Sequence, residues 1–158
     1  MANPLTVLAR ALGTKPWLMG LAGGIIWVDK KLHRLFKGKV SLVALAGLPS
    51  LRLTTIGRKS GLPRGTNLLY FPHEGDFVLV GSNWGRPADP AWTYNLRSKP
   101  EAVVALAGKE IPVLARELLG DEYDAMWTLL LAFWPGYSME EKAARRVLPI
   151  FALKPTTR

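Results

Sequence analysis

Short extended segments joined by tight turns constrain the fold of this chain more than any other feature. Residues Leu51–Ile56, Arg64–Phe71 and Phe77–Gly81 have strand character, and turns at Gly57–Gly61 and Glu74-Gly75 separate them. Parallel strands need a crossover of about a dozen residues or more, which neither turn supplies. The stretch therefore predicts an antiparallel meander.

The next stretch adds a helix and a second hairpin. A loop rich in Gly and Pro, Ser82–Pro90, precedes a short helix that we expect over residues 90–98. Val103–Ala107 and Ile111–Leu118 then predict another hairpin. Within it Pro112 indicates an edge strand or a bulge, because proline cannot donate to a strand ladder.

The C-terminal third begins with a predicted helix that Asp121 can cap. The helix ends before Pro135 and Gly136 and carries an apolar stripe on one face. The stripe consists of Met126, Trp127, Leu130, Leu131 and Trp134.

A second helix and a last strand complete the predicted elements. Ser138 and Glu141 have the spacing of a capping box, so we expect a helix from there to about Val147. Leu148–Leu153 has strand character. Roughly six strands with a few helices predict an α+β barrel and not a doubly wound sheet.

Composition limits the chemistry that is open to the chain. Its 158 residues are 49% hydrophobic and 21% charged, which is typical of one folded domain and excludes disorder. We divide that domain into an N-terminal helical segment, residues 1–40, and a barrel, residues 41–158. There is no cysteine and there are only two histidines, so thiol chemistry is excluded and no metal site is expected. Redox chemistry would need a bound organic cofactor.

A formal net charge of +9 favours anionic partners, namely phosphates, polyacids, nucleic acid or an anionic membrane surface. No nucleic-acid motif is recognised, and we expect no nucleic-acid partner. The uncharged run Pro16–Val28 is shorter than the about 20 apolar residues of a spanning helix. Asp29 and Lys30 follow it in place of a cleavage site, so a cytoplasmic protein is predicted.

The N-terminal segment has two explanations. Residues 3–15 predict a short helix with Leu5, Leu8 and Leu12 on one face. Beyond the apolar run lies a basic patch of Lys30, Lys31, Arg34, Lys37 and Lys39. Residues 1–39 can rest on the anionic inner face of a membrane, or the helix can pack on the protein's own core with a solvated basic flank.

The first polar cluster is the turn Gly57-Arg58-Lys59-Ser60-Gly61, with Arg64 and Thr66 just after it. Its glycines let the backbone approach an anion, which Arg and Lys would neutralise. The spacing of a P-loop is absent. The segment fits a phosphate or polycarboxylate cradle, or else a solvated hairpin turn, in which Gly, Lys and Ser are common.

The second polar cluster, Gly81–Pro87, follows a strand and leads to Pro90, Trp92 and Asn95. A flat heterocycle needs hydrogen-bond partners at its edge and an apolar wall on its face, and this mixture supplies both. Taken alone, Trp92 is equally well explained by core packing, and Asn95 by a helix-to-loop hydrogen bond.

Two segments, LTTIGRKSGLPRGTNLLYF and VGSNWGRPADPAWTYNLRSKP, resemble the deazaflavin-dependent nitroreductase family of actinobacteria. The similarity extends from about Leu51 to the C-terminus. It implies a split β-barrel that binds coenzyme F-420, an 8-hydroxy-5-deazaflavin. It also implies hydride transfer to a quinone, an enone, another activated alkene or a nitro compound. The alternatives on this fold are an FMN-dependent oxidoreductase and a non-catalytic carrier of an apolar ligand such as a fatty acid.

The resemblance assigns roles to individual residues. Arg58, Lys59, Ser60 and Arg64 match the turn that holds the cofactor's phosphate and oligoglutamate tail. The other cofactor-binding matches are Thr66 and Leu68 beside the ring, Ser82, Asn83 and Gly85 in the loop at the ring and tail, and Trp92 and Asn95 in the closing helix. Asn67 stands where the family usually has Pro, so hydrogen bonds at the ring edge can differ.

Tyr137 matches a pocket tyrosine of the family, whereas Trp134 and Glu140 stand where the nitroreductase has further tyrosines. This departure puts nitroimidazole reduction in doubt and leaves the natural acceptor open. A hydroxyl such as Tyr137 or Ser82 can stabilise the charge on the acceptor or give it a proton. Tyr137 is the preferred donor, although it can also be a pocket wall only. The predicted substrate pocket consists of Trp17, Trp84, Trp134 and Tyr137.

Overall fold

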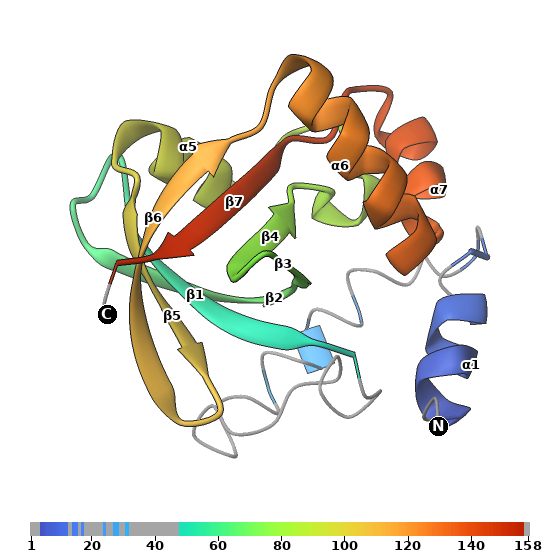
Figure 1. The fold of residues 1–158 in the computed structure, drawn as a ribbon, viewed down its shortest axis with the longest axis horizontal. Helices are drawn as coiled ribbons and strands as arrows, with labels where there is room; N and C mark the ends of the chain where they lie inside the picture. The colour runs from blue at the N-terminus through green and yellow to red at the C-terminus, as the bar shows by residue number, and fades with distance from the viewer. Residues whose placement is uncertain are drawn as a thin grey trace.

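The computed structural model describes residues 4–12, 14–15, 17, 24, 27–28, 31 and 48–156. Within them a seven-stranded sheet curls into a barrel with helices beside it (Figure 1). In chain order the elements are α1 (Pro4–Leu12), β1 (Ser50–Ile56), β2 (Pro63–Leu69), β3 (Phe71–His73), β4 (Asp76–Val80), η1 (Asn83–Gly85), α5 (Ala91–Ser98), β5 (Glu101–Leu106), β6 (Lys109–Glu117), α6 (Gly120–Phe133), α7 (Gly136–Ala144) and β7 (Ile150–Pro155).

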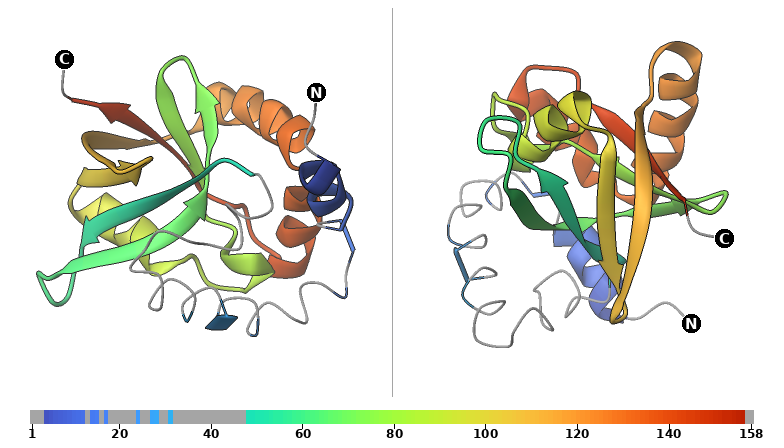
Figure 2. Two further views of the ribbon diagram at one scale, coloured as in Figure 1. Left: turned by 90° about the horizontal axis from the view of Figure 1, so that it is seen from below. Right: turned by 90° about the vertical axis from the view of Figure 1, so that its left-hand side faces the viewer.

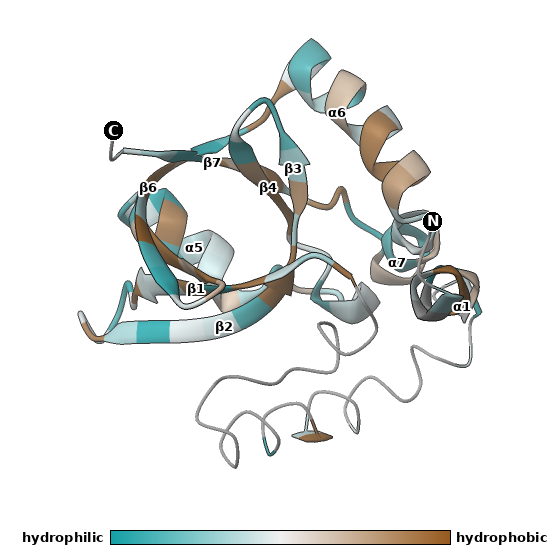
Figure 3. Ribbon diagram, turned by 60° about the horizontal axis from the view of Figure 1, so that its bottom comes forward, coloured by the Kyte–Doolittle hydropathy of each residue, from teal (hydrophilic) through white to brown (hydrophobic). Residues whose placement is uncertain are grey.

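The strand order is β2-β1-β5-β6-β7-β4-β3, and every neighbouring pair is antiparallel. β2 and β3 follow each other in the chain with only Tyr70 between them, yet they lie at the two ends of this order. The chain thus joins the two edges of the sheet, which curls it into the ring seen in Figure 3. The predicted α+β split barrel is confirmed, with seven strands in place of about six.

The predicted meander is wrong in its pairing. The expected strand Arg64–Phe71 is interrupted at Tyr70, whose N–H donates to the Pro49 carbonyl at 3.1 Å. β4 pairs with β3 and β7, and not with β2. The short turns therefore join strands only in pairs, because the curl of the sheet carries the chain to its other edge at Tyr70.

Two hydrophobic clusters form the core, one inside the barrel and one between the barrel and α6 and α7. Along β4, Leu79 belongs to the inner cluster, and Val78 and Val80 belong to the outer one. β7 alternates in the same way, and strands buried on both faces are expected to be continuously apolar. α5 adds Trp92 and Leu96 to the inner cluster, and Figure 3 shows this helix across the ring.

The caps predicted for the two C-terminal helices are wrong. α6 begins at Gly120, so Asp121 lies within its first turn, where a carboxylate suits the helix dipole, and does not cap it. α7 begins before Ser138, because Pro135 already has helical φ and ψ of −59° and −21°, and it ends at Ala144, because Arg145 has a left-handed φ of 56°. The apolar stripe of α6 is confirmed, since all of its residues lie in or against the outer cluster.

The prediction that Pro112 marks an edge strand or a bulge is also wrong, since the register of β6 with β5 continues without interruption through Pro112. Pro112 lies in β6, which has β5 on one side and β7 on the other. The β6–β7 ladder begins next to it, where Val113 faces Pro155. The carbonyl of Pro112 still accepts from the N–H of Thr156 at 2.9 Å, so the missing donor falls at the end of the ladder.

The N-terminal helix α1 agrees with the helix expected over residues 3–15, and Val7 and Leu8 are exposed on it. No helix in the described part of the chain is both long and apolar enough to cross a membrane. The side chains of Leu5 and Leu12 and the proposed boundary at residue 40 lie outside the described residues. The same holds for most of the basic patch, namely Lys30, Arg34, Lys37 and Lys39.

Candidate functional site

The turn between β1 and β2 is compact. The N–H of Gly57 donates to the Leu62 carbonyl, and the N–H of Gly61 donates to the Gly57 carbonyl, each at 2.8 Å. A Cβ atom on Gly57 would lie 2.5 Å from Ser60 Oγ, and Gly61 has a φ of +69°. Both positions therefore favour glycine, and the backbone of the predicted cradle has one well-defined shape.

Two side-chain hydrogen bonds of Asn95, in α5, hold this turn in place. Its Oδ1 accepts from the N–H of Arg58 at 3.0 Å, and its Nδ2 donates to Thr55 Oγ1 at 3.0 Å. Both Asn95 and Thr55 are buried, so the hydrogen bond between them is shielded from water, and the one to Arg58 is partly buried. The helix-to-loop hydrogen bond that the sequence suggested for Asn95 is present, and it orients the backbone of the cationic turn.

The cations of the turn face solvent. Arg58, Lys59 and Arg64 are exposed, and within the described residues no carboxylate lies within ion-pair distance of any of them. The guanidinium of Arg58 lies over the ring of Tyr94, 4.8 Å from its centroid. Uncompensated cations on a fixed turn fit an acidic ligand, and this donor set suits phosphate and carboxylate groups.

β2 places its predicted residues on two faces. Arg64, Thr66 and Leu68 stand opposite inward-facing residues of β1, and Leu68 packs against the inner cluster. Asn67 stands opposite Arg52, on the other face of the strand. β2 spans seven residues, or about 20 Å at the usual rise of a strand, so it extends the site well beyond the turn. In Figure 2 the hairpin of β1 and β2 projects from the barrel at the end that carries the turn.

The loop after β4 has an unusual backbone. Asn83, Trp84 and Gly85 have φ values of +48°, +58° and +77°. A tryptophan with positive φ is uncommon, and such strain is typical of sites whose shape serves a ligand. The Asn83 side chain does not project freely, since its Nδ2 donates to the Ala88 carbonyl at 3.0 Å.

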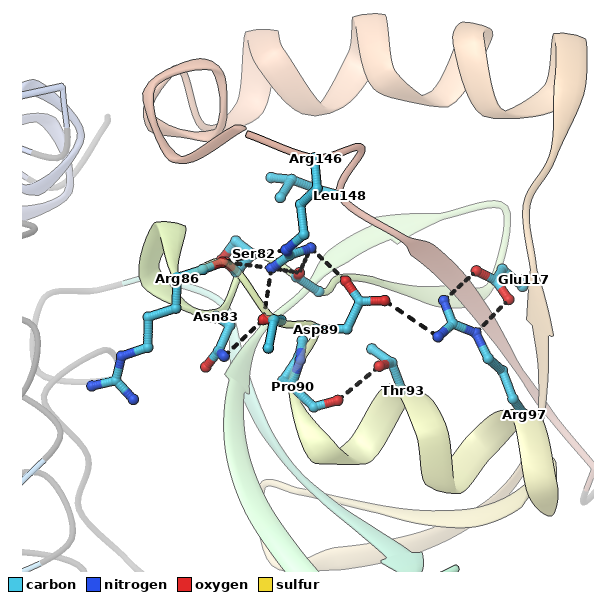
Figure 4. A network of polar contacts seen from close by, with 12 residues as sticks. Ser82, Asn83, Arg86, Asp89, Pro90, Thr93, Arg97, Glu117, Arg146 and Leu148 are labelled. Atoms are coloured by element: carbon cyan, nitrogen blue, oxygen red, sulfur yellow. Dashed lines mark hydrogen bonds and ion pairs between the residues drawn. The ribbon is translucent and has the colours of Figure 1, made fainter. Parts of the chain in front are cut away.

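Arg146, which follows α7, holds this loop in place (Figure 4). Its guanidinium donates to the carbonyls of Gly81, Ser82, Arg86 and Ala88, at 3.1–3.3 Å. It also pairs with Asp89 at 2.5 Å. One side chain thus donates to four backbone carbonyls of a loop that has little regular structure. Nothing in the sequence around Arg146 predicts this role, because the loop lies about 60 residues earlier in the chain.

Asp89 connects the loop to the rest of the barrel. Its other oxygen accepts from Arg97 at 3.3 Å, and Arg97 pairs with both carboxylate oxygens of Glu117 at 2.8 and 2.9 Å. The hydrogen bond with Glu117 is the largest cause of a raised pKa of Arg97. The network therefore ties the loop to α5 and β6 through paired charges, as Figure 4 shows.

Ser82 and Tyr137, the two predicted catalytic residues, lie around the same carboxyl group. Ser82 hydrogen-bonds to Glu140, whose pKa is raised to about 7 mainly by burial and lowered in part by that hydrogen bond. Tyr137 is buried with an exposed fraction of 5%, and burial, followed by the charge of Glu140, raises its pKa. The structure therefore places a hydroxyl, a phenol and a carboxyl group together where η1 meets α7.

The predicted pocket tryptophans are spread over the molecule. Trp134 follows α6 and packs on the outer cluster that contains Tyr137. Trp84 is half-buried in the loop. Trp17 is 56% exposed, and most residues around it in sequence lie outside the described part. Trp92 lies in the inner core, edge-on to Phe151 at 5.6 Å, so its side chain packs as the core explanation proposed.

Two hollows lie elsewhere on the described surface. One of about 370 Å³ lies beside Asp89, Arg97 and Tyr123, and one of about 670 Å³ lies between the sheet and α6. None of the predicted site residues lines either hollow. Among the described residues no group of three or more potential metal ligands occurs.

Comparison with known proteins agrees with this architecture. Residues 28–155 match the family model of the F420H(2)-dependent quinone reductases. The F420H(2)-dependent quinone reductase Rv1261c of Mycobacterium tuberculosis is 28% identical over 101 residues, which are 63% of this chain and 68% of that protein.

Solved structures give the same result. An F420-H2 dependent reductase (FDR-A) is 32% identical, with a TM-score of 0.61 over 67% of this chain and 94% of that chain. A second structure, a domain-swapped dimer, is 29% identical, with a TM-score of 0.63 over 81% of this chain and 97% of that chain. The family match covers both motif segments and most of the chain. The chain therefore belongs to the F420H(2)-dependent quinone reductase family, whose members are oxidoreductases that use coenzyme F-420.

Proposed function

We propose that this protein transfers hydride from reduced F-420 to a quinone. The observation that carries the proposal is the cationic turn, whose backbone Asn95 fixes and whose exposed charges have no acidic partner in the described structure. Such a turn would attract a cofactor that carries a phosphate and a polyglutamate tail.

In this proposal the residues of the turn bind the tail, and the loop around Ser82 binds the ring. Arg58, Lys59 and Arg64 supply charge, and Ser60 supplies a hydroxyl. Thr66 lies two residues beyond Arg64 in β2, further from the turn. Ser82, Asn83 and Gly85 belong to a strained loop, and Arg146 holds that loop rigid. A rigid loop favours catalysis because little reorganisation is then needed when the acceptor binds.

The bound deazaflavin supplies the hydride, and the protein's own residues manage the proton. Burial raises the pKa of Tyr137, so its phenol stays protonated at physiological pH and can donate a hydrogen bond, although it is a weaker acid than an exposed tyrosine. A phenol or hydroxyl close to the acceptor oxygen stabilises the negative charge that hydride transfer creates there. Tyr137 is our preferred donor, with Ser82 as the second candidate.

The direct test is to mix the protein with reduced F-420 and a panel of acceptors, then follow reoxidation of the cofactor. The proposal predicts the fastest reoxidation with a quinone such as menaquinone, and slower reactions with enones or nitro compounds. Reoxidation that is no faster than without protein, although the cofactor is bound, would disprove quinone reduction. Titration with FMN, and a search for fatty acid in the purified protein, test the two alternatives on this fold.

A quinone acceptor suggests a function for the N-terminal segment, namely contact with a membrane. Quinones partition into membranes, and α1 exposes Val7 and Leu8 to solvent. We propose that residues 1–39 touch the membrane surface peripherally and that the protein is cytoplasmic. Sedimentation with anionic vesicles tests this, and a variant lacking residues 1–39 that sediments equally well would contradict it.

A further inference from the structure

A carboxyl group beside Ser82 has no part in the function proposed above. Glu140 lies on α7, and the Ser82 hydroxyl hydrogen-bonds to its side chain across the contact of α7 with η1. Its Oε2 is shielded from solvent and has no hydrogen-bond partner in the described structure. A shielded oxygen that accepts nothing is unfavourable when the carboxyl group is ionised, so this position suits a protonated acid.

A carboxyl group and a hydroxyl group can hydrogen-bond in two directions. Ionised Glu140 can only accept, and the hydrogen of Ser82 must then point towards it. Protonated Glu140 can donate to Ser82 Oγ, which leaves the hydrogen of Ser82 free to point elsewhere. The backbone at Ser82 cannot easily turn away, because Arg146 donates to the Ser82 carbonyl at 3.1 Å.

We propose that Glu140 is a positioning residue whose protonation state sets the direction in which Ser82 donates. With Glu140 protonated, Ser82 donates a hydrogen bond to an oxygen of bound F-420. With Glu140 ionised, Ser82 donates to Glu140 instead, and that bond to the cofactor is lost. The inference rests on the proposed placement of the cofactor beside Ser82.

The surroundings of Glu140 place this change near neutral pH. Burial raises the pKa of Glu140 to about 7, and the hydrogen bond with Ser82 only partly opposes it. The described titratable and charged groups on the neighbouring elements are Tyr137, Glu141 and Lys142 on α7, Arg145 and Arg146 just after it, Arg86 after η1, Asp121, Glu122, Tyr123 and Asp124 on α6, and Arg10 on α1. None of them forms an ion pair with Glu140 among the described residues, so no cation holds the carboxyl group in its charged form.

The test is fluorescence titration of F-420 with the wild-type protein and with Glu140→Gln, from about pH 6 to about pH 8.5. The glutamine amide can donate to Ser82 Oγ at every pH, so the variant keeps the direction of the protonated state. The ratio of the wild-type Kd to the variant Kd should be near one at pH 6 and rise to about fivefold at pH 8.5, as expected for one lost hydrogen bond. Titration of the cofactor itself cancels in this ratio.

Two controls separate this effect from a general change in charge. Glu141→Gln removes the same charge from the same helix, and its ratio should stay constant with pH. In a Ser82→Ala background, adding Glu140→Gln should leave the ratio constant as well. A ratio that rises equally for Glu141→Gln, or that rises without Ser82, would overturn the inference.

The remaining outcomes also distinguish the inference from the proposed function. If F-420 binds and the Glu140→Gln ratio does not change with pH, the inference is wrong and the proposed function stands. If no protein binds F-420 at any pH, both are wrong. Should Glu140→Gln fail to fold, carbon-13 NMR of the wild-type protein without cofactor decides. A Glu140 titration midpoint close to the ordinary 4.5 would overturn the inference.

Discussion

Asn95 in α5 accepts a hydrogen bond from the backbone N–H of Arg58 at 3.0 Å, and this single contact joins a barrel-closing helix to the cationic turn. The two residues lie 37 positions apart in the chain. The same amide reaches Thr55 at the end of β1, so one buried side chain fixes both the strand end and the turn. The charges that we propose to bind the cofactor are therefore carried on a backbone that the core of the protein positions.

Asn95→Ala should lower the free energy of unfolding by about 2–3 kcal/mol, because it leaves the N–H of Arg58 and the hydroxyl of Thr55 without partners. It should also weaken F-420 binding, since the turn loses its fixed shape. Urea unfolding and cofactor titration measure the two effects. Ser98→Ala, at an exposed position of the same helix, should change neither by a measurable amount. Stability of Asn95→Ala equal to wild type would contradict the anchoring role.

Arg64→Ala should raise the Kd for F-420 about tenfold or more, because a charge-assisted hydrogen bond to the tail is lost. The effect should shrink as salt is added, since exposed charges are screened. Lys109→Ala removes one positive charge from the hairpin turn between β5 and β6 and serves as the control. Equal losses of affinity in the two variants would mean that net charge, and not the turn, attracts the cofactor.

Tyr137→Phe should lower turnover about tenfold or more while changing the Kd for F-420 much less, because the phenol is proposed to act on the acceptor. Tyr123→Phe is the matched control. The Tyr123 hydroxyl donates to the Leu148 carbonyl at 2.7 Å, so its removal should affect stability and not turnover. Unchanged turnover of Tyr137→Phe with the cofactor fully bound would remove Tyr137 from the mechanism.

Arg146→Met should destabilise the protein by about 3 kcal/mol, because Asp89 and several loop carbonyls lose their shared donor. Arg146→Lys should recover only part of this, since an ammonium group cannot reproduce the planar fork of the guanidinium. Arg145→Met, at the exposed neighbouring position, is the control. If Arg146→Met bound F-420 as tightly as wild type, the loop would not depend on this clamp for its binding shape.

The stability of the wild-type protein should fall as pH rises towards 7. The pKa of Glu140 is about 7 in the folded protein against an ordinary value of 4.5, so the folded state binds more protons between these values. The contribution is complete below about pH 4.5 and is lost as pH rises through about 7, amounting to roughly 3 kcal/mol at most. Urea unfolding of the wild-type protein and of Glu140→Gln across this pH range isolates the contribution of Glu140 to the free energy of unfolding. Parallel stability curves for the two proteins would exclude the shift.

Turn residues and apolar periodicity predicted much of the fold, because turns, strands and helices depend on residues close together in sequence. The turn at Gly57 and the alternating apolar residues of β1 gave the hairpin, and the apolar stripe of α6 gave its buried face. Pairing between β4 and β7 depends on the closure of the barrel, which no local pattern records. The capping box at Ser138 failed because Pro135, three residues earlier, already adopts helical angles.

The candidate site likewise has a part that the sequence predicted and a part that it did not. The cations of the turn were recognisable because they are adjacent in sequence. Arg146 and Glu140 were not assigned a role, since each acts on the Ser82 loop from more than 50 residues away. A lone Arg or Glu on or just after a helix is common on protein surfaces, so only the folded structure distinguishes these two.

The most direct test of the account is a crystal structure of the protein grown with excess F-420. The account predicts the acidic tail against Arg58, Lys59 and Arg64, with the ring reaching the loop at Ser82. A well-ordered cofactor bound at another place, with the turn between β1 and β2 exposed to solvent and free of ligand, would contradict it.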